Sequence, residues 1–210
     1  MAEMLDWSRA EKVTSPAQVT ELSALDSPDY ALREQAFNLR SLLDELEQVF
    51  RHEALDKGLS LAFEVADGAG GSYMGDADCL KRALTLLIDN AIRFTPRGRV
   101  RIRVAAEHAS PESSELLFEV EDSGIGIDAA TRQDLFGAFG RVGELSGGAG
   151  LGLVLCRAII ERLQGHLDVD STPGRGSRFW FRVPLHRLAP QGLAGAGGNL
   201  SAAMSTPETG

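Results

Sequence analysis

An asparagine in an otherwise apolar helical run is the first residue whose type suggests chemistry. Asn90 lies in the run Leu84–Thr95, where leucine and isoleucine recur at helical spacing. A buried amide must be hydrogen-bonded or must coordinate a ligand, although a satisfied core asparagine or an exposed one fits the pattern equally well. Arg93 and Phe94 follow one turn later. A cation, an aromatic ring and a lone amide would together suit a phosphate, a metal ion and a flat base.

A carboxylate followed by two glycines is the second candidate. The run Asp122–Ile127 directly follows a strand-like segment and contains Gly124 and Gly126. The glycines let the backbone turn tightly and approach a ligand. The carboxylate at the strand end can accept a hydrogen bond from an exocyclic amine, such as that of adenine. A plain turn of aspartate, serine and glycine is the competing interpretation.

A third run, Gly147–Leu153, places four glycines at the start of a helix-like segment. Free amides at a helix N-terminus bind phosphate. The run lacks the lysine and hydroxyl residue of a P-loop, and it does not follow a strand as a dinucleotide-binding fingerprint does. Both of those interpretations therefore fail, and a flexible surface loop remains the alternative to phosphate binding.

The elements that must position these runs follow from hydrophobic periodicity. One helix is predicted from Ser41, with Asp44 in a capping-box arrangement and Val49 in the apolar stripe, and a second from Asp76 as N-cap to Pro96. Shorter helices are predicted over 129–139 and 151–163, and strands over 36–39, 59–65, 99–105, 116–121, 167–169 and 177–183. These elements do not alternate as βαβ units. They predict an α+β fold, a two-layer α/β sandwich with a mixed sheet covered on one face by helices.

Composition limits the classes of protein and partner. The chain has 210 residues, 43% of them hydrophobic, enough for a real core in one or two domains. Its net charge of −9 argues against nucleic acid or an anionic membrane as a partner. Cys79 and Cys156 fall in helix-like patterns, which favours buried reduced thiols over a disulfide. No apolar run approaches the roughly 20 residues of a membrane helix.

The three runs together, in this order, resemble the Bergerat ATP-binding fold shared by sensor histidine kinases, type II topoisomerases, heat-shock chaperones and mismatch-repair ATPases. The chain is most similar to the catalytic and ATP-binding domain of bacterial two-component histidine kinases, including hybrid kinases. Asn90–Pro96 resembles their N box, Asp122–Ile127 their first glycine box, Phe136–Phe139 their F box and Gly148–Leu153 their second glycine box. Shorter matches to the family's layout are Phe37–Arg40, Lys57–Leu59, Gly75–Asp76 and Gly174–Phe179.

The resemblance implies ATP and Mg²⁺ as cofactors and assigns roles residue by residue. Asn90 would ligate Mg²⁺, Arg93 would contact phosphates and Phe94 would pack near the nucleoside. Asp122 would hold the adenine amine, while Gly124 and Gly126 give the base room. The remaining nucleotide-contacting residues, on the lid and its hinge, would be Arg141, Gly148, Gly150, Leu151 and Gly152.

The resemblance also implies domain organisation and partners. Residues 1–12 resemble the end of a dimerisation helix, 13–35 a linker, 36–186 the ATP-binding domain and 187–210 a flexible tail. No histidine of the chain has the setting of the phospho-acceptor, so no catalytic residue is assigned. The expected partners are the dimerisation and phospho-acceptor domain of the same or another histidine kinase, and a response regulator or receiver domain. The expected location is the cytoplasm, without direct membrane contact by this segment; anchoring of a longer protein in the inner membrane is compatible with the family.

Two departures from the family keep a second hypothesis open. Leu86 occupies the position one turn before Asn90, where the kinases usually place asparagine, and it should face the same pocket. The segment from Phe139 to Gly150 is short for the family and has Arg141 as its only cation. The leading function is γ-phosphoryl transfer from ATP to a histidine. The alternative is a degenerate domain that binds nucleotide weakly or not at all and regulates another kinase by contact.

Overall fold

The described residues form a seven-stranded mixed sheet with helices packed against it. The computed structural model describes residues 16–25, 27, 30–107, 113–137 and 151–189. The strands are β1 (Gln35–Asn38), β2 (Leu59–Val65), β3 (Ser72–Gly75), β4 (Gly98–Glu107), β5 (Ser113–Asp122), β6 (His166–Thr172) and β7 (Gly176–Arg187). Their order is β1-β3-β7-β5-β4-β2, with β6 also paired to β7. Among the strand pairs of the described residues, only β2–β4 is parallel.

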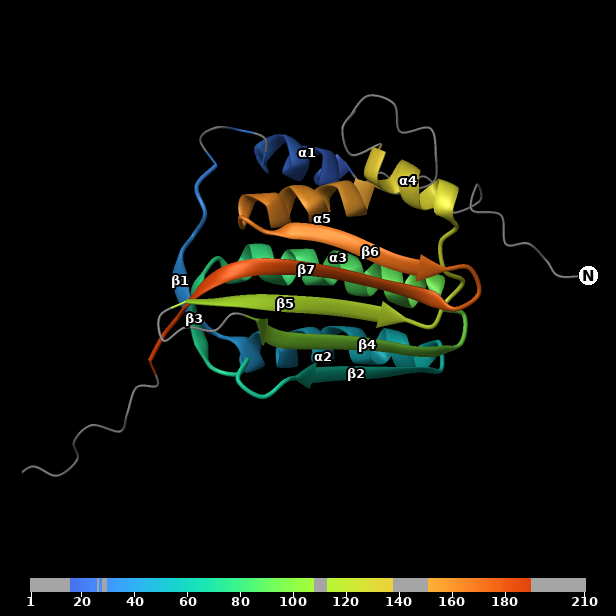
Figure 1. Ribbon diagram of the computed structural model, residues 1–210, viewed down its shortest axis with the longest axis horizontal. Coiled ribbons are helices and arrows are strands. Elements are labelled where there is room, and N and C mark those ends of the chain that lie inside the picture. The colour runs from blue at the N-terminus through green and yellow to red at the C-terminus, as the bar shows by residue number, and fades with distance from the viewer. Residues whose placement is uncertain (1–15, 26, 28–29, 108–112, 138–150, 190–210) are drawn as a thin grey trace, which may run out of the picture.

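Helices line one face of this sheet, and others lie farther out (Figure 1). The helices are α1 (Pro16–Leu25), α2 (Leu39–Asp56), α3 (Ala77–Phe94), α4 (Ala129–Gly137) and α5 (Leu151–Arg162). Contacts join α2 to α3, α3 to α5, and α5 to α1. The α+β architecture with helices against a mixed sheet confirms the fold predicted from the sequence.

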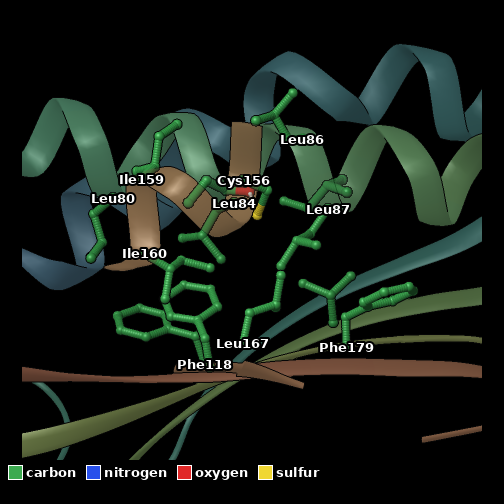
Figure 2. Packing of buried hydrophobic residues seen from close by; sticks show 14 of the residues in the cluster. Leu80, Leu84, Leu86, Leu87, Phe118, Cys156, Ile159, Ile160, Leu167 and Phe179 are labelled. Carbon is green, nitrogen blue, oxygen red and sulfur yellow. Dashed lines mark hydrogen bonds between the residues drawn. The ribbon is translucent and has the colours of Figure 1, made fainter. Parts of the chain in front are cut away.

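The core lies between the sheet and α2, α3 and α5. Alternation along β4 buries Val100, Ile102 and Val104 completely, as a strand with one covered face requires. Figure 2 shows Leu84 and Leu87 of α3 pointing toward the sheet, above Leu167 and the ring of Phe118. Asp76 caps α3 as predicted, because its side chain accepts a 2.9 Å hydrogen bond from the N–H of Cys79. Cys79 and Cys156 are buried and free, as expected.

Helix α2 departs from its prediction in two ways. It begins at Leu39, because Asn38 is its N-cap and accepts a 3.1 Å hydrogen bond from the N–H of Ser41. The predicted capping box at Ser41 is therefore wrong. Val49 is 64% exposed. It precedes the buried Phe50 by one residue, about 100° around the helix, and so falls off the covered face.

Two elements had no counterpart in the prediction. The segment from 13 to 35, expected to be a linker without regular structure, contains helix α1, whose Leu22 and Leu25 are buried. The glycine-rich turn from 67 to 75 contains strand β3, which pairs with β1 and with the end of β7. The predicted flexible tail and the end of a dimerisation helix lie outside the described residues, apart from the start of the tail.

Candidate nucleotide-binding site

Asp122 ends β5 as a buried carboxylate, 7% exposed. Its Oδ1 accepts a 2.8 Å hydrogen bond from the N–H of Gly124, and Ser177, opposite it on β7, also hydrogen-bonds to the carboxylate. Burial raises the pKa of Asp122 above its ordinary value of 3.8, and these hydrogen bonds oppose that shift only in part. A carboxylate has about four acceptor positions, so capacity remains for another donor.

The two glycines after Asp122 are required by the protein's own backbone. A side chain at Gly124 would overlap the carbonyl of Phe94, which accepts a 3.2 Å hydrogen bond from the N–H of Ile125. Gly126 has a φ of +69°, and a side chain there would collide with the backbone of Thr172. These contacts join the first glycine box to the end of α3 and to the end of β6. The predicted role of both glycines in giving a base room stays a prediction.

A pair of serines supports this turn and was not predicted. Ser171 accepts a 2.8 Å hydrogen bond from the N–H of Ile127 and donates at 3.0 Å to the carbonyl of Gly176. Its hydroxyl also lies 3.0 Å from that of Ser177. The family-like run Gly174–Phe179 contains Ser177 and was a usable signal. Ser171 lies in an ordinary strand pattern. It comes close to the Asp122 turn only because β6 pairs with β7, where Ser171 lies opposite Ser177.

One face of α3 connects the glycine boxes. Leu86, Asn90 and Phe94 are spaced by four residues and therefore share that face. The carbonyl of Phe94 contacts the Asp122 turn, while Leu86 contacts the first turn of α5. Asn90 lies between these two contacts, half-buried, and its amide has no hydrogen-bonding partner within the described residues. The structure thus brings Phe94 and the Asp122 turn together, and Asn90 lies one turn before Phe94 on the same face of α3.

Leu86 is only 7% exposed. Figure 2 shows it on the side of α3 away from the sheet, opposite to the direction of Leu84 and Leu87. A methyl group at Gly152 would lie 3.6 Å from Cδ2 of Leu86 and 3.9 Å from Nε2 of Gln18, so α1, α3 and α5 meet at this point. The side chain therefore packs between these helices. This structural role was not predicted from the sequence.

The remaining predicted site residues have different placements. Arg93 is exposed and forms a 3.0 Å ion pair with Asp89, one turn earlier on α3. Exposed pairs of this kind are worth about 0.3–0.5 kcal/mol, so Arg93 is free to exchange partners. Leu151 is buried, and with Gly152 it opens α5, whose first N–H groups suit phosphate. The predicted contacts Arg141, Gly148 and Gly150 lie outside the described residues.

Comparisons with known proteins agree with this geometry. The family described as histidine kinase-, DNA gyrase B- and HSP90-like ATPase matches residues 75–187. The signal transduction histidine-protein kinase BarA of Escherichia coli K12 is 33% identical over 171 residues, which cover 80% of this chain and 19% of BarA. The sensor histidine kinase GacS of Pseudomonas protegens is 35% identical over 172 residues, with the same two shares. The crystal structure of full-length ShkA in complex with AMPPNP has a TM-score of 0.71 and 25% identity, covering 82% of this chain and 35% of ShkA.

The fold and the family match define a domain of the ATPase class shared by these proteins. The chain belongs to the histidine kinase-, DNA gyrase B- and HSP90-like ATPase family. Within that family it is an ATPase catalytic domain of the histidine kinases of two-component signalling. It spans about a fifth of the length of the curated relatives that it matches. In the described part of the chain, no helix combines the length and apolarity needed to cross a bilayer.

The packing of Leu86 makes a prediction about stability. Leu86→Asn is expected to lower the free energy of unfolding by about 1–3 kcal/mol, because a polar amide would be buried without a partner among apolar neighbours. Urea denaturation measures this change. Val49→Asn is the matched control, since Val49 also lies on a helix but is 64% exposed. Equal, small losses in both variants would contradict the assigned packing role.

Proposed function

We propose that this domain binds Mg²⁺-ATP between α3, the Asp122 turn and the start of α5, and donates the γ-phosphoryl group to a histidine of a dimerisation domain. The observation that carries the proposal is the position of Asn90. Its amide has no hydrogen-bonding partner among the described residues and lies on the same face of α3 as the contact with the Asp122 turn and the contact with α5. This spacing supports one site formed by the amide, the buried carboxylate and the start of α5.

The residues present fit an adenine nucleotide. The Asp122 carboxylate, fixed by Gly124 and Ser177, has acceptor capacity left for the exocyclic amine of adenine. Phe94 is half-buried at the end of α3, beside that turn, where an aromatic side chain can pack near the nucleoside. Gly124 and Gly126 allow the turn to pack closely against the neighbouring backbone, which side chains at these positions would displace.

The residues also fit a phosphate-bound Mg²⁺. Mg²⁺ prefers oxygen ligands and keeps several waters, so one amide oxygen together with substrate phosphates is a sufficient site. When bound, the ion neutralises the developing charge of the transferred phosphoryl group. Asn90 would hold the ion through its amide oxygen. The N–H groups at the start of α5, with Arg93 and Arg141, would hold the phosphates.

The degenerate alternative depended on Leu86 and on the short segment from Phe139 to Gly150. Leu86 is buried against the start of α5, and so it does not present an open apolar wall. The second segment lies outside the described residues. No observation favours loss of function, and we retain the kinase domain as the proposal, located in the cytoplasm where ATP and a response regulator or receiver domain are available.

The chain alone is expected not to phosphorylate itself. Its histidine that most resembles an acceptor, His52, is exposed on α2 inside the ATP-binding domain and does not lie on a dimerisation helix. Incubation with γ-labelled ATP should leave the chain unlabelled, whereas addition of a separate dimerisation domain from a related histidine kinase should yield acid-labile label on that domain. Acid-labile label on His52, or a labelled acceptor with Asn90→Ala equally active, would contradict the proposal.

A further inference from the structure

Helix α1 extends the hydrophobic core beyond α5, because its Leu22 and Leu25 belong to the same buried cluster. It lies on the outer side of α5, away from the sheet (Figure 1). Its contacts are with α5, through buried Leu22 and Leu25, and with α3, through Glu21. The Glu21 carboxylate accepts hydrogen bonds from Arg82 at 3.0 Å to Oε1 and 2.8 Å to Oε2, a bidentate geometry that fixes orientation as well as distance.

The chain that follows α1 is tied to the same helices. The carbonyl of Ser27 accepts a 3.0 Å hydrogen bond from Arg162 at the end of α5. The hydroxyl of Tyr30 lies 3.2 Å from Sγ of Cys79 in the first turn of α3. The N–H of Arg33 donates at 2.8 Å to Asp76, the residue that caps α3. Attachments to both helices therefore hold α1 in one place.

Gln18, in the first turn of α1, is the residue of this helix that lies near the start of α5. A methyl group at Gly152, in the first turn of α5, would lie 3.9 Å from Nε2 of Gln18 and 3.6 Å from Cδ2 of Leu86, so both side chains lie beside this glycine. This turn carries the N–H groups that the proposed function assigns to phosphate. Removing α1 would therefore open the space beside Gly152 and Leu86.

We propose that α1 is a positioning strap that holds the first turn of α5 against Leu86 and thereby sets the affinity of the site for nucleotide. The inference rests on the proposed function, because it concerns the same site. Coupling between two sites is reciprocal: if docked α1 favours nucleotide, bound nucleotide must favour docked α1 to the same extent. Displacement of α1 by segments that precede it would then lower the affinity of the site for nucleotide.

The test uses the whole chain, Mg²⁺ and AMPPNP as the probe. In the wild type, AMPPNP should slow hydrogen exchange in residues 16–25 as well as in the first turn of α5. Leu22→Glu, which places a charge in a buried position of α1, should abolish that protection and weaken AMPPNP binding by about fivefold or more, the lower range of measured coupling. Glu21→Arg should act in the same direction, and Glu21→Arg with Arg82→Glu should restore affinity.

A matched control removes a similar ion pair on another side of α3. Glu45→Arg breaks the pair between Glu45 of α2 and Lys81, which does not involve α1, and should leave affinity within twofold. The inference is overturned if AMPPNP binds the wild type without changing exchange in α1, or if Leu22→Glu releases α1 while affinity stays unchanged. Either result leaves the proposed function intact, whereas a wild-type chain that binds no AMPPNP contradicts both.

Discussion

Asp122→Asn is expected to weaken ATP binding by about 10- to 150-fold, because a hydrogen bond to a charged group is worth about 1.5–3 kcal/mol. Asparagine has a single acceptor oxygen, and the N–H of Gly124 already donates to Oδ1 of Asp122. The new NH₂ group would then meet the adenine amine as a second donor. Isothermal titration with Mg²⁺-ATP measures the loss.

The control for this substitution is the neighbouring Glu121→Gln. Glu121 precedes Asp122 on β5, and its side chain forms a 2.6 Å ion pair with Arg101 of β4. Successive residues of a strand point to opposite faces, so this change removes no hydrogen-bonding group of the site, although it removes a charge that helps to raise the pKa of Asp122. An Asp122→Asn protein with wild-type affinity, or a Glu121→Gln protein with the same loss, would show that the adenine contact is wrongly assigned.

The raised pKa of Asp122 adds a pH dependence. Only the ionised carboxylate accepts from the adenine amine without competition from its own proton. Because burial raises its pKa, protonation begins at a higher pH than for an ordinary aspartate. ATP affinity of the wild type should therefore fall as the pH is lowered through that raised pKa, and this component of the pH profile should be missing from Asp122→Asn.

Asn90→Ala is expected to remove the Mg²⁺ dependence of ATP binding and to abolish phosphoryl transfer, while the fold remains at least as stable. The amide has no hydrogen-bonding partner among the described residues, so its loss leaves no buried group unsatisfied. Alanine is also the better helix former, by at most about 0.7 kcal/mol. Titrations at several Mg²⁺ concentrations, with thermal unfolding of the same samples, separate binding from stability.

Asp89→Asn is the control for Asn90→Ala. It removes the charge that pairs with Arg93 on the same helix but leaves the amide in place. If Asp89→Asn and Asn90→Ala reduced Mg²⁺-dependent binding equally, the effect would come from local charge or from Arg93, and the assignment of Asn90 as a metal ligand would be wrong.

The features predicted correctly from the sequence are those that hydrophobic periodicity and helix capping within one segment determine. Alternation of Val100, Ile102 and Val104 predicted β4, and Asp76 predicted the start of α3. The runs around Asn90 and Asp122 led to the prediction that the end of α3 meets the turn after β5, and the hydrogen bond from the N–H of Ile125 to the carbonyl of Phe94 joins these two segments. The motifs identify the fold, and the fold in turn predicts which segments lie next to one another.

The missed features depend on contacts between distant segments. Helix α1 shows little amphipathic pattern: among its residues whose burial the structure describes, only Leu22 and Leu25 are buried, and its docking uses residues on α3 and α5. Leu86 was expected to face the pocket because it shares a face with Asn90, but its surroundings are set by Gly152. Ser171 supports the Asp122 turn only through strand pairing. Periodicity along one segment carries no signal for such contacts.

The central claim is that Asp122 and Asn90 form an adenine nucleotide site, and base selectivity tests it most directly. Adenine presents an amine to the Asp122 carboxylate, whereas guanine presents a carbonyl oxygen at the corresponding position, which the carboxylate repels. Calorimetric titration of the wild-type chain with ATP and with GTP, at one Mg²⁺ concentration, should give saturable binding of ATP and at least about tenfold weaker binding of GTP, the loss expected for one charge-assisted hydrogen bond. Equal affinities for the two nucleotides, or no binding of ATP, would contradict the account.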